Sequence, residues 1–142
     1  MIIQPHAKSL LLAILLTFSS AAIVAGQGRI RPPNGVKCDP NHLTSFTGTV
    51  GFYRRNSSRL FLRMRTDEET SEQFTLKFAK GQDASKSFLL DGEEFKRGDW
   101  PLIERSRYRL RSNMRATVWV CDDQSNPIID WRPREQKGGS VY

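Results

Sequence analysis

Histidine, cysteine and long apolar runs are all scarce in this chain, which holds two histidines and two cysteines among 142 residues. After residue 26 the only histidine is His42, so the sequence has no zinc-ligand spacing and no recognisable nucleophile with a histidine base. No run beyond that point approaches the roughly 20 apolar residues that cross a bilayer. We therefore predict no catalytic residue, no metal ligand, no cofactor and no later membrane span.

The first 26 residues have the features of a secretory signal peptide. Lys8 is their only charged residue, Leu10 to Ala25 is almost entirely apolar or small, and small residues precede Gln27, the expected new N-terminus. We expect cleavage and a secreted or periplasmic protein without stable membrane insertion. The alternative is an uncleaved membrane anchor, because the apolar stretch is only slightly shorter than the roughly 20 residues of a membrane span.

Acidic residues are outnumbered by basic ones in the expected mature chain, residues 27–142. It holds 21 lysines and arginines (22 minus Lys8) against 15 aspartates and glutamates, a formal charge of +6. This balance favours acidic partners such as nucleic acid, anionic polysaccharide or lipid headgroups. It also keeps a small protein soluble, and both interpretations remain open.

The two cysteines, Cys38 and Cys121, both lie in the part expected to be exported. An even count in an oxidising compartment predicts one disulfide, which would stabilise the fold by about 4 kcal/mol on the chain-entropy model. A metal site would need further ligands, and His42 is the only histidine that remains. We therefore predict a Cys38–Cys121 bridge.

Three runs between Phe46 and Lys80 alternate apolar and polar residues at period two, the pattern of strands with one buried face. The residues expected to point inward are Phe46, Val50 and Phe52 in the first run, Leu60, Leu62 and Met64 in the second, and Phe74, Leu76 and Phe78 in the third. Residues 54–58 are predicted as a polar turn. Gly48 and Gly51 indicate a bulge or bend, by which a sheet curls toward a barrel.

The second half of the chain predicts an irregular segment between further strands. Residues 93–105 could plug one end of a barrel, where Gly98 and Pro101 argue against a long helix. The apolar side chains of this plug are Phe95, Trp100, Leu102 and Ile103. Residues 107–111, 114–121 and 127–131 again read as strands. The fold class is therefore predicted as mostly β, a small OB-like barrel of five to seven antiparallel strands with an irregular plug.

Four segments carry a resemblance to known proteins: the FTGTV opening at Phe46, the RLFLRMR and QFTLKF hairpin, and the late RATVWV strand. In this pattern the chain resembles the small exported OB-like β-barrel domains of bacterial proteins of unknown function. The resemblance covers about residues 43–131 and implies a fold but no site residues. The expected layout is a signal peptide (1–26), an N-terminal lead-in (27–42), the barrel domain (43–131) and a flexible basic tail (132–142).

The outer face of the predicted sheet is the main candidate site. Its members are Tyr53, Arg59, Phe61, Arg63, Arg65 and Lys77. Arginines can follow a phosphate backbone, and an exposed aromatic ring can stack on a base or a sugar. Two alternatives stay open: a solvated face that protects exposed strands from aggregation, and arginines neutralised by Glu69 or Glu72.

Two other motifs are read mainly as turns. Arg97-Gly98-Asp99 resembles the tripeptide by which some extracellular proteins engage integrins, which requires an exposed loop. An acidic cluster near the end of a predicted strand has oxygen ligands that suit calcium, but its spacing matches no EF-hand loop. Its members are Asp122, Asp123, Asn126 and Asp130.

These features predict an exported, non-catalytic binding module for a polyanionic or glycan ligand. The alternative is an exported structural or protein-interaction accessory domain that meets an acidic protein. A small secreted hydrolase is less favoured, because carboxylate pairs such as Glu93-Glu94 lie in predicted polar turns, where raised pKa values are not expected. The oligomeric state does not follow from the sequence.

Overall fold

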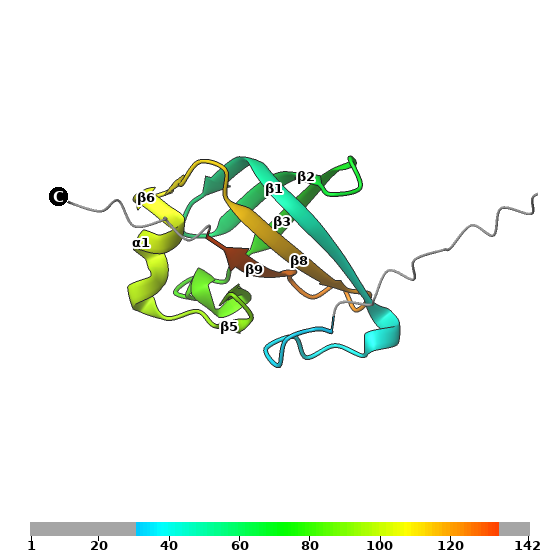
Figure 1. Ribbon diagram of the computed structural model, residues 1–142. Coiled ribbons are helices and arrows are strands. Elements are labelled where there is room, and N and C mark those ends of the chain that lie inside the picture. Colours follow the sequence, from blue (N-terminus) through cyan, green and yellow to red (C-terminus); the bar gives the residue numbers. More distant parts are fainter. Residues whose placement is uncertain (1–30, 134–142) are drawn as a thin grey trace, which may run out of the picture. The chain divides into compact units, whose positions relative to one another are not determined.

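The computed structural model describes residues 31–133, which form a mostly β domain (Figure 1). The predicted signal peptide and residues 134–142 of the predicted tail lie outside the described residues. The strands are β1 (Leu43–Arg55), β2 (Arg59–Thr66), β3 (Ser71–Lys77), β4 (Phe88–Leu90), β5 (Glu93–Glu94), β6 (Glu104–Ser106), β7 (Arg109–Leu110), β8 (Arg115–Cys121) and β9 (Ile128–Arg132). The helices are short: η1 (Pro40–His42), η2 (Ala84–Ser87), η3 (Arg97–Asp99) and α1 (Trp100–Ile103).

Seven strands form one sheet in the order β3-β2-β1-β8-β9-β4-β5, and β6 and β7 form a separate hairpin. Neighbouring strands are antiparallel except β4 and β9, which are parallel, so the prediction of an all-antiparallel sheet is wrong for this pair. Within residues 31–133 the edge strands β3 and β5 are not paired with each other, and no closed barrel forms. The mostly β class is confirmed, and the OB-like arrangement stays a prediction.

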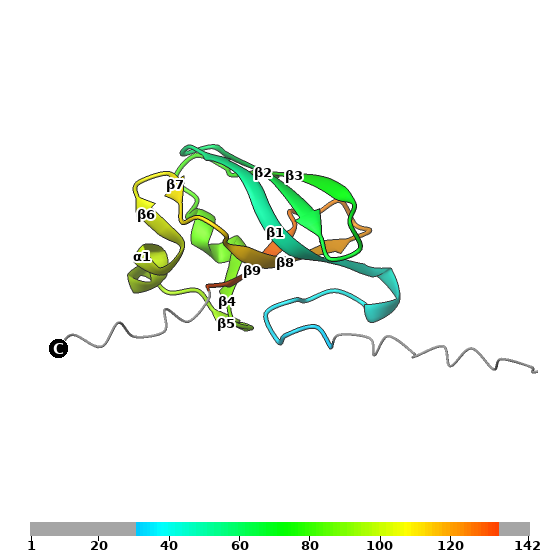
Figure 2. The ribbon, with the colours of Figure 1, turned by 45° about the horizontal axis from the view of Figure 1, so that its top comes forward.

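Strand β1 is long because it pairs with two other strands, one after the other along its length. Its first half, from Leu43 to Thr49, pairs with β8, and its second half, from Gly48 to Arg55, pairs with β2. The sheet therefore bends where the two pairings overlap. The β1–β2–β3 meander consequently folds over β8, β9 and β4 (Figure 2).

Gly48 lies at this overlap, opposite Thr66 of β2 and Ala116 of β8. A Cβ atom there would collide with the Arg65 carbonyl group and lie 2.7 Å from the Thr66 Cα. At Gly51, by contrast, the nearest atom to an added Cβ would be the Arg63 carbonyl oxygen, 4.0 Å away.

We expect Gly48→Ala to lower the free energy of unfolding by roughly 2–3 kcal/mol, because backbone atoms must move to admit the methyl group. Gly51→Ala is the matched control in the same strand and should change stability by less than about 1 kcal/mol. Urea denaturation of both variants measures the difference. Equal effects would contradict the close approach of β1 and β2 at Gly48.

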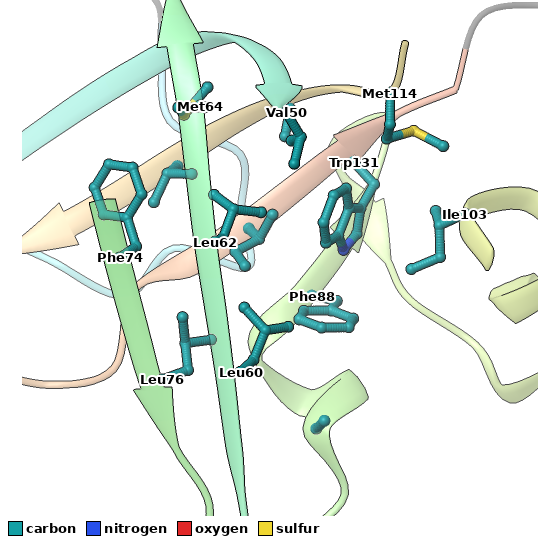
Figure 3. Close-up of a cluster of buried hydrophobic side chains, with 14 of the residues drawn as sticks. Val50, Leu60, Leu62, Met64, Phe74, Leu76, Phe88, Ile103, Met114 and Trp131 are labelled. Atoms are coloured by element: carbon teal, nitrogen blue, oxygen red, sulfur yellow. The ribbon is translucent and has the colours of Figure 1, made fainter. Parts of the chain in front are cut away.

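The main core fills the space inside the bent sheet. Leu60 and Leu62 of β2 face Phe88 of β4 and Trp131 of β9, and Met64 of β2 belongs to the same buried cluster (Figure 3). The remaining buried members are Val50, Phe74, Leu76, Phe78, Ala84, Phe95, Ile103, Met114, Ala116, Val118 and Ile129. The inward sets predicted for β2 and β3 are confirmed, since all of their members are buried.

In β1 one inward prediction is wrong, because the strand contains a bulge. The pairing with β2 slips by one residue between Val50 and Phe52, which makes Gly51 the extra residue. Since side chains alternate with period two, the slip turns Phe52 outward and Tyr53 inward. Phe52 is 42% exposed, whereas the ring of Tyr53 packs against the main core.

A smaller core covers the other side of β8. Trp119 points away from the main core and is buried with Val36 and Leu89. Val36 belongs to the predicted lead-in, so the described part of that segment packs on the sheet. Cys38, on the same segment, forms the predicted disulfide with Cys121, the two Cα atoms lying 6.1 Å apart.

Most apolar side chains of the predicted plug segment lie in the main core, although no closed barrel exists within residues 31–133 for the segment to plug. Phe95 and Ile103 are buried, and Trp100 packs edge-on against Phe88 and Phe95. Pro101 stands in α1, which is a single turn, as expected from the argument against a long helix. The prediction for Leu102 is wrong, because its side chain is 47% exposed.

Candidate functional site

The outward residues of β1, β2 and β3 form a continuous basic face. Cross-strand register places Arg63 between Phe52 and Gln73, and it places Arg59 beside Lys77. We call the following set the basic face: Phe52, Arg54, Arg59, Phe61, Arg63, Arg65 and Lys77. Five of the six predicted site residues belong to it: Arg59, Phe61, Arg63, Arg65 and Lys77.

The charges of the basic face are not neutralised by nearby acids. Within residues 31–133, no ion pair involves Arg59, Arg63, Arg65 or Lys77. Glu72 stands opposite Met64, whose side chain points into the core, so Glu72 lies on the other side of the sheet. Its carboxylate accepts a hydrogen bond from Thr70 at 2.9 Å. Internal pairing with Glu72, one of the alternatives raised by the sequence, is therefore not observed.

Two phenylalanines stand among these arginines. The rings of Phe52 and Phe61 meet edge to face with centroids 5.7 Å apart. The Arg63 guanidinium lies 5.9 Å from the centre of the Phe52 ring, a cation–π distance. Sequence reasoning missed Phe52, because the bulge at Gly51 reverses its side. The face therefore presents apolar aromatic rings beside positive charges that have no acidic partner among residues 31–133.

Tyr53, the sixth predicted residue, does not belong to this face. Its hydroxyl donates a 2.6 Å hydrogen bond to Glu104 Oε1 on the core side of the sheet. Arg55 Nε donates to the same oxygen at 2.9 Å, and Arg55 Nη2 donates to Glu104 Oε2 at 3.0 Å. The backbone N–H of Tyr108 completes the set, at 2.9 Å from Oε2. We call these groups the Glu104 network.

The Glu104 network is nearly closed to water, and this shifts its titration. Side-chain exposure is 12% for Arg55 and 5% for Glu104. Burial raises the pKa of Tyr53 far above its ordinary value, and the bond to Glu104 adds to this. Burial also pushes the pKa of Glu104 upward, but the bonds from Arg55, Tyr53 and Tyr108 outweigh it and hold that pKa below its ordinary value. Glu104 is therefore ionised and Tyr53 neutral near pH 7.

Two aromatic rings contact the Arg55 guanidinium. Its guanidinium carbon lies 4.1 Å from the centre of the Trp100 ring and 4.6 Å from the centre of the Tyr108 ring. No local pattern indicates this arrangement, because Arg55 and Glu104 are 49 positions apart in the chain. Arg55 also lines a surface groove of about 540 Å³.

The two other motifs make structural contacts of their own. Arg97, Gly98 and Asp99 form the 3-10 helix η3, not an extended loop. Asp99 is half-buried, and its carboxylate accepts the Lys96 N–H at 2.7 Å. The tripeptide thus uses its acid to cap a turn.

The acidic cluster is dispersed among separate partners. Asp122 pairs with His42 at 3.3 Å, and Asp123 accepts the Ser125 N–H at 2.9 Å. Asp130 is fully buried and accepts the Gly92 N–H at 2.8 Å. Over the part of the chain that the structure describes, no group of three or more histidine, cysteine, aspartate or glutamate side chains could hold a metal ion.

Asn126, the fourth member, links the β8–β9 loop to β3. Its side-chain amide donates to the Lys77 carbonyl at 2.7 Å, while its oxygen accepts the Lys77 N–H at 3.0 Å. Its side chain thereby makes the two hydrogen bonds to the Lys77 backbone that a neighbouring strand would make at the edge of β3.

No helix between residues 31 and 133 has the length and apolar character needed to span a membrane. Comparisons of the chain with protein-family models, with curated proteins and with solved structures each found no match.

Proposed function

We propose that the chain is an exported, non-catalytic module that binds a linear polyanion through the basic face. One observation carries this proposal: arginines with no acidic partner among residues 31–133 flank two exposed or half-exposed phenylalanine rings. Charged side chains on a sheet usually serve solubility, but a phenylalanine exposed among them serves no such purpose.

The arginines and the phenylalanines of the basic face have different roles in binding. Arg63 and Arg65 alternate with buried residues along β2, so their Cα atoms stand about 7 Å apart and point the same way. Such a row can meet successive anionic groups of a polymer. Arginine suits this role because its planar guanidinium donates two parallel hydrogen bonds to a phosphate or sulfate group. The pair Phe52 and Phe61 adds a surface for a flat ligand group.

Support for a non-catalytic role comes from the buried carboxylates. Among residues 31–133 these are Glu104 and Asp130. Glu104 accepts four hydrogen bonds, and Asp130 is held by Gly92 and Arg132. A general acid or base needs a carboxylate that can exchange a proton with substrate, which neither of these offers.

Export is part of the same proposal, and the Cys38–Cys121 disulfide supports it, because such bonds persist in oxidising compartments. The OB-like expectation is retained in a weaker form. A three-strand meander that begins with a bent strand paired on both sides is compatible with it, although β3 and β9 do not pair within residues 31–133.

Binding to heparin and to an oligonucleotide across a salt series tests the proposal. We expect Arg59→Ser/Arg63→Ser/Arg65→Ser to weaken binding by roughly 10- to 100-fold near physiological salt. The slope of log affinity against log salt should fall by about 2, since each lost phosphate contact contributes about 0.7 to 0.9.

A matched control removes three positive charges elsewhere, from Arg31, Lys37 and Lys86, which are all exposed and lie outside the basic face. It should retain affinity within a few-fold, because only general attraction is lost. Equal losses in both triple variants, or no binding of either polymer at physiological salt, would refute the basic face as a polyanion site. In the second case an acidic protein becomes the better candidate partner.

A further inference from the structure

The basic face continues past Phe52 onto the β6–β7 hairpin. A groove of about 500 Å³ joins the two, lined on one side by Gly51 and Phe52 and on the other by Arg105, Arg109 and Arg111. Figure 2 shows β6 and β7 near the end of β1 that leads into β2. The bulge that turns Phe52 outward therefore also places its ring at the junction between sheet and hairpin.

A second groove, the one of about 540 Å³ that Arg55 lines, extends this surface. It shares Arg105 and Tyr108 with the first groove and adds Arg97 and Arg107. We call Arg97, Arg105, Arg107 and Arg109 together the hairpin arginines. Three of them lie in the β6–β7 hairpin, and Arg97 belongs to helix η3. All four are exposed, and none forms an ion pair within residues 31–133.

Two acids also line the second groove, but they do not cancel its charge. Glu104 is already matched by Arg55 at 2.9 Å, so that pair is neutral as a unit. The other acid is Asp83, whose carboxylate accepts the Ser85 N–H at 3.0 Å. Against Asp83 stand Arg97, Arg105 and Arg107, which leaves the groove positively charged.

The Glu104 network fixes the hairpin in relation to the sheet. Glu104 begins β6 and accepts the N–H of Tyr108 in the hairpin turn, while its other bonds come from Tyr53 and Arg55 of β1. The hairpin arginines and the basic face are therefore held in one arrangement before any ligand arrives. Such preorganisation lowers the entropic cost of binding.

The aromatic rings indicate which polyanion fits best. Every nucleic acid base has a flat aromatic face, and stacking on a protein ring contributes about 1–3 kcal/mol per base. A sugar can also pack on an aromatic ring, but it offers only C–H groups and no aromatic face of its own. In a duplex the bases are already stacked inside, so only a single strand can offer them to Phe52 and Phe61.

Building on the proposed function, we propose that the polyanion is a single-stranded nucleic acid whose backbone runs from the basic face, over Phe52, into the grooves along the hairpin arginines. The bases stack on Phe52 and Phe61, and phosphates meet Arg63 on one side and Arg105 and Arg109 on the other.

Fluorescence anisotropy with labelled oligothymidylate of about 15 nucleotides tests this path, a length within the range that single-strand-binding domains of this size cover. Arg105→Ser/Arg109→Ser should weaken binding roughly tenfold and lower the salt slope by about 1.4, since two phosphate contacts are lost. The matched control, Arg31→Ser/Lys37→Ser, removes equal charge from the N-terminal segment and should stay within about twofold of the unchanged protein.

A second pair of variants separates stacking from apolar contact. Phe52→Ala should weaken oligothymidylate binding roughly tenfold, and Phe52→Leu should do nearly the same, because leucine keeps the bulk but has no ring. Heparin retention should be almost unchanged in both variants. Trp100, which lines the second groove, should also lose fluorescence when the oligonucleotide binds, whereas Trp119 and Trp131 are buried.

The outcomes for this path and for the basic face can be told apart. If the triple face variant weakens oligothymidylate and heparin alike while the hairpin and Phe52 variants weaken neither, the single-strand path is refuted and the basic face remains. Tighter binding of a duplex of equal length, or binding of heparin alone, also refutes the path. If the triple face variant changes nothing, both proposals fail.

Discussion

Replacing Glu104 with alanine is expected to lower the free energy of unfolding by roughly 3–5 kcal/mol, the cost of removing one partner of a buried ion pair. The change leaves the Arg55 guanidinium, 12% exposed, without its counter-charge. It also removes the acceptor of the Tyr53 hydroxyl and of the Tyr108 N–H. Urea denaturation followed by circular dichroism measures the loss.

The double variant Arg55→Met/Glu104→Leu is the informative control. It removes both charges and fills the space with apolar atoms, so it should be closer in stability to the unchanged protein than Glu104→Ala is. If the double variant is less stable than Glu104→Ala, the loss of stability comes from lost packing of Arg55 on Trp100 and Tyr108 and not from an unpaired charge.

The contribution of Glu104 to stability should depend on pH, with a defined sign. The pKa of Glu104 is lowered in the folded state from its ordinary value of 4.5. The stability that this carboxylate contributes is therefore fully present above about pH 4.5 and is lost as pH falls through the lower, folded-state pKa. Glu104→Gln should accordingly differ most from the unchanged protein near neutral pH and less in acid. A constant difference would contradict an ionised Glu104.

Removing the disulfide with Cys38→Ala/Cys121→Ala is expected to cost about 4 to 5 kcal/mol, because the bridge closes a loop with a sequence separation of 83. Domains of this size typically have a total stability of 5–15 kcal/mol, so a large part of it would be lost. We expect the melting temperature to fall by more than about 15 °C, measured by calorimetry.

A reducing agent should lower the melting temperature of the unchanged protein by a similar amount and leave the double variant unaffected. Val36 and Trp119 provide the separate contribution of packing, because they hold the same segment without the covalent bond. Val36→Ala should therefore reduce stability further in the disulfide-free variant. An unchanged melting temperature after reduction of the disulfide would contradict a constraining role for the bridge.

The parts of the fold that were predictable from sequence are those fixed by local alternation. The β2–β3 hairpin is one: Leu60, Leu62 and Leu76 are buried, and Arg59, Arg63 and Arg65 are exposed. A short connection and strict period two leave few other arrangements for such a segment. Cys38 and Cys121 were likewise predictable, because they are the only two cysteines.

The errors arise where one residue changes the register or where the contacts are distant. Gly51 signalled a bulge, but the sequence alone does not say which residues change sides beyond it, so Phe52 and Tyr53 were exchanged. The sequence predicts a turn over residues 54–58, whereas β1 extends to Arg55. The reason is the contact of Arg55 with Glu104, which no local pattern can reveal.

Sheet closure was also beyond local reasoning. The parallel pairing of β4 with β9 depends on where the plug returns the chain, and it leaves β3 and β5 as edges within residues 31–133. The sequence predicts five to seven strands in a single barrel, whereas residues 31–133 form a seven-stranded sheet and a separate two-stranded hairpin. The strand order follows from contacts between distant segments.

The position of the disulfide determines how the domain would respond to mechanical force. Cys121 ends β8, a central strand, and stands opposite Leu43 at the start of β1. Under tension applied at Arg31, the residues before Cys38 could be drawn off the sheet, including Val36 from its place beside Trp119. The load would then pass through the sulfur–sulfur bond into β8, and the strands that carry the basic face would be spared until that bond broke.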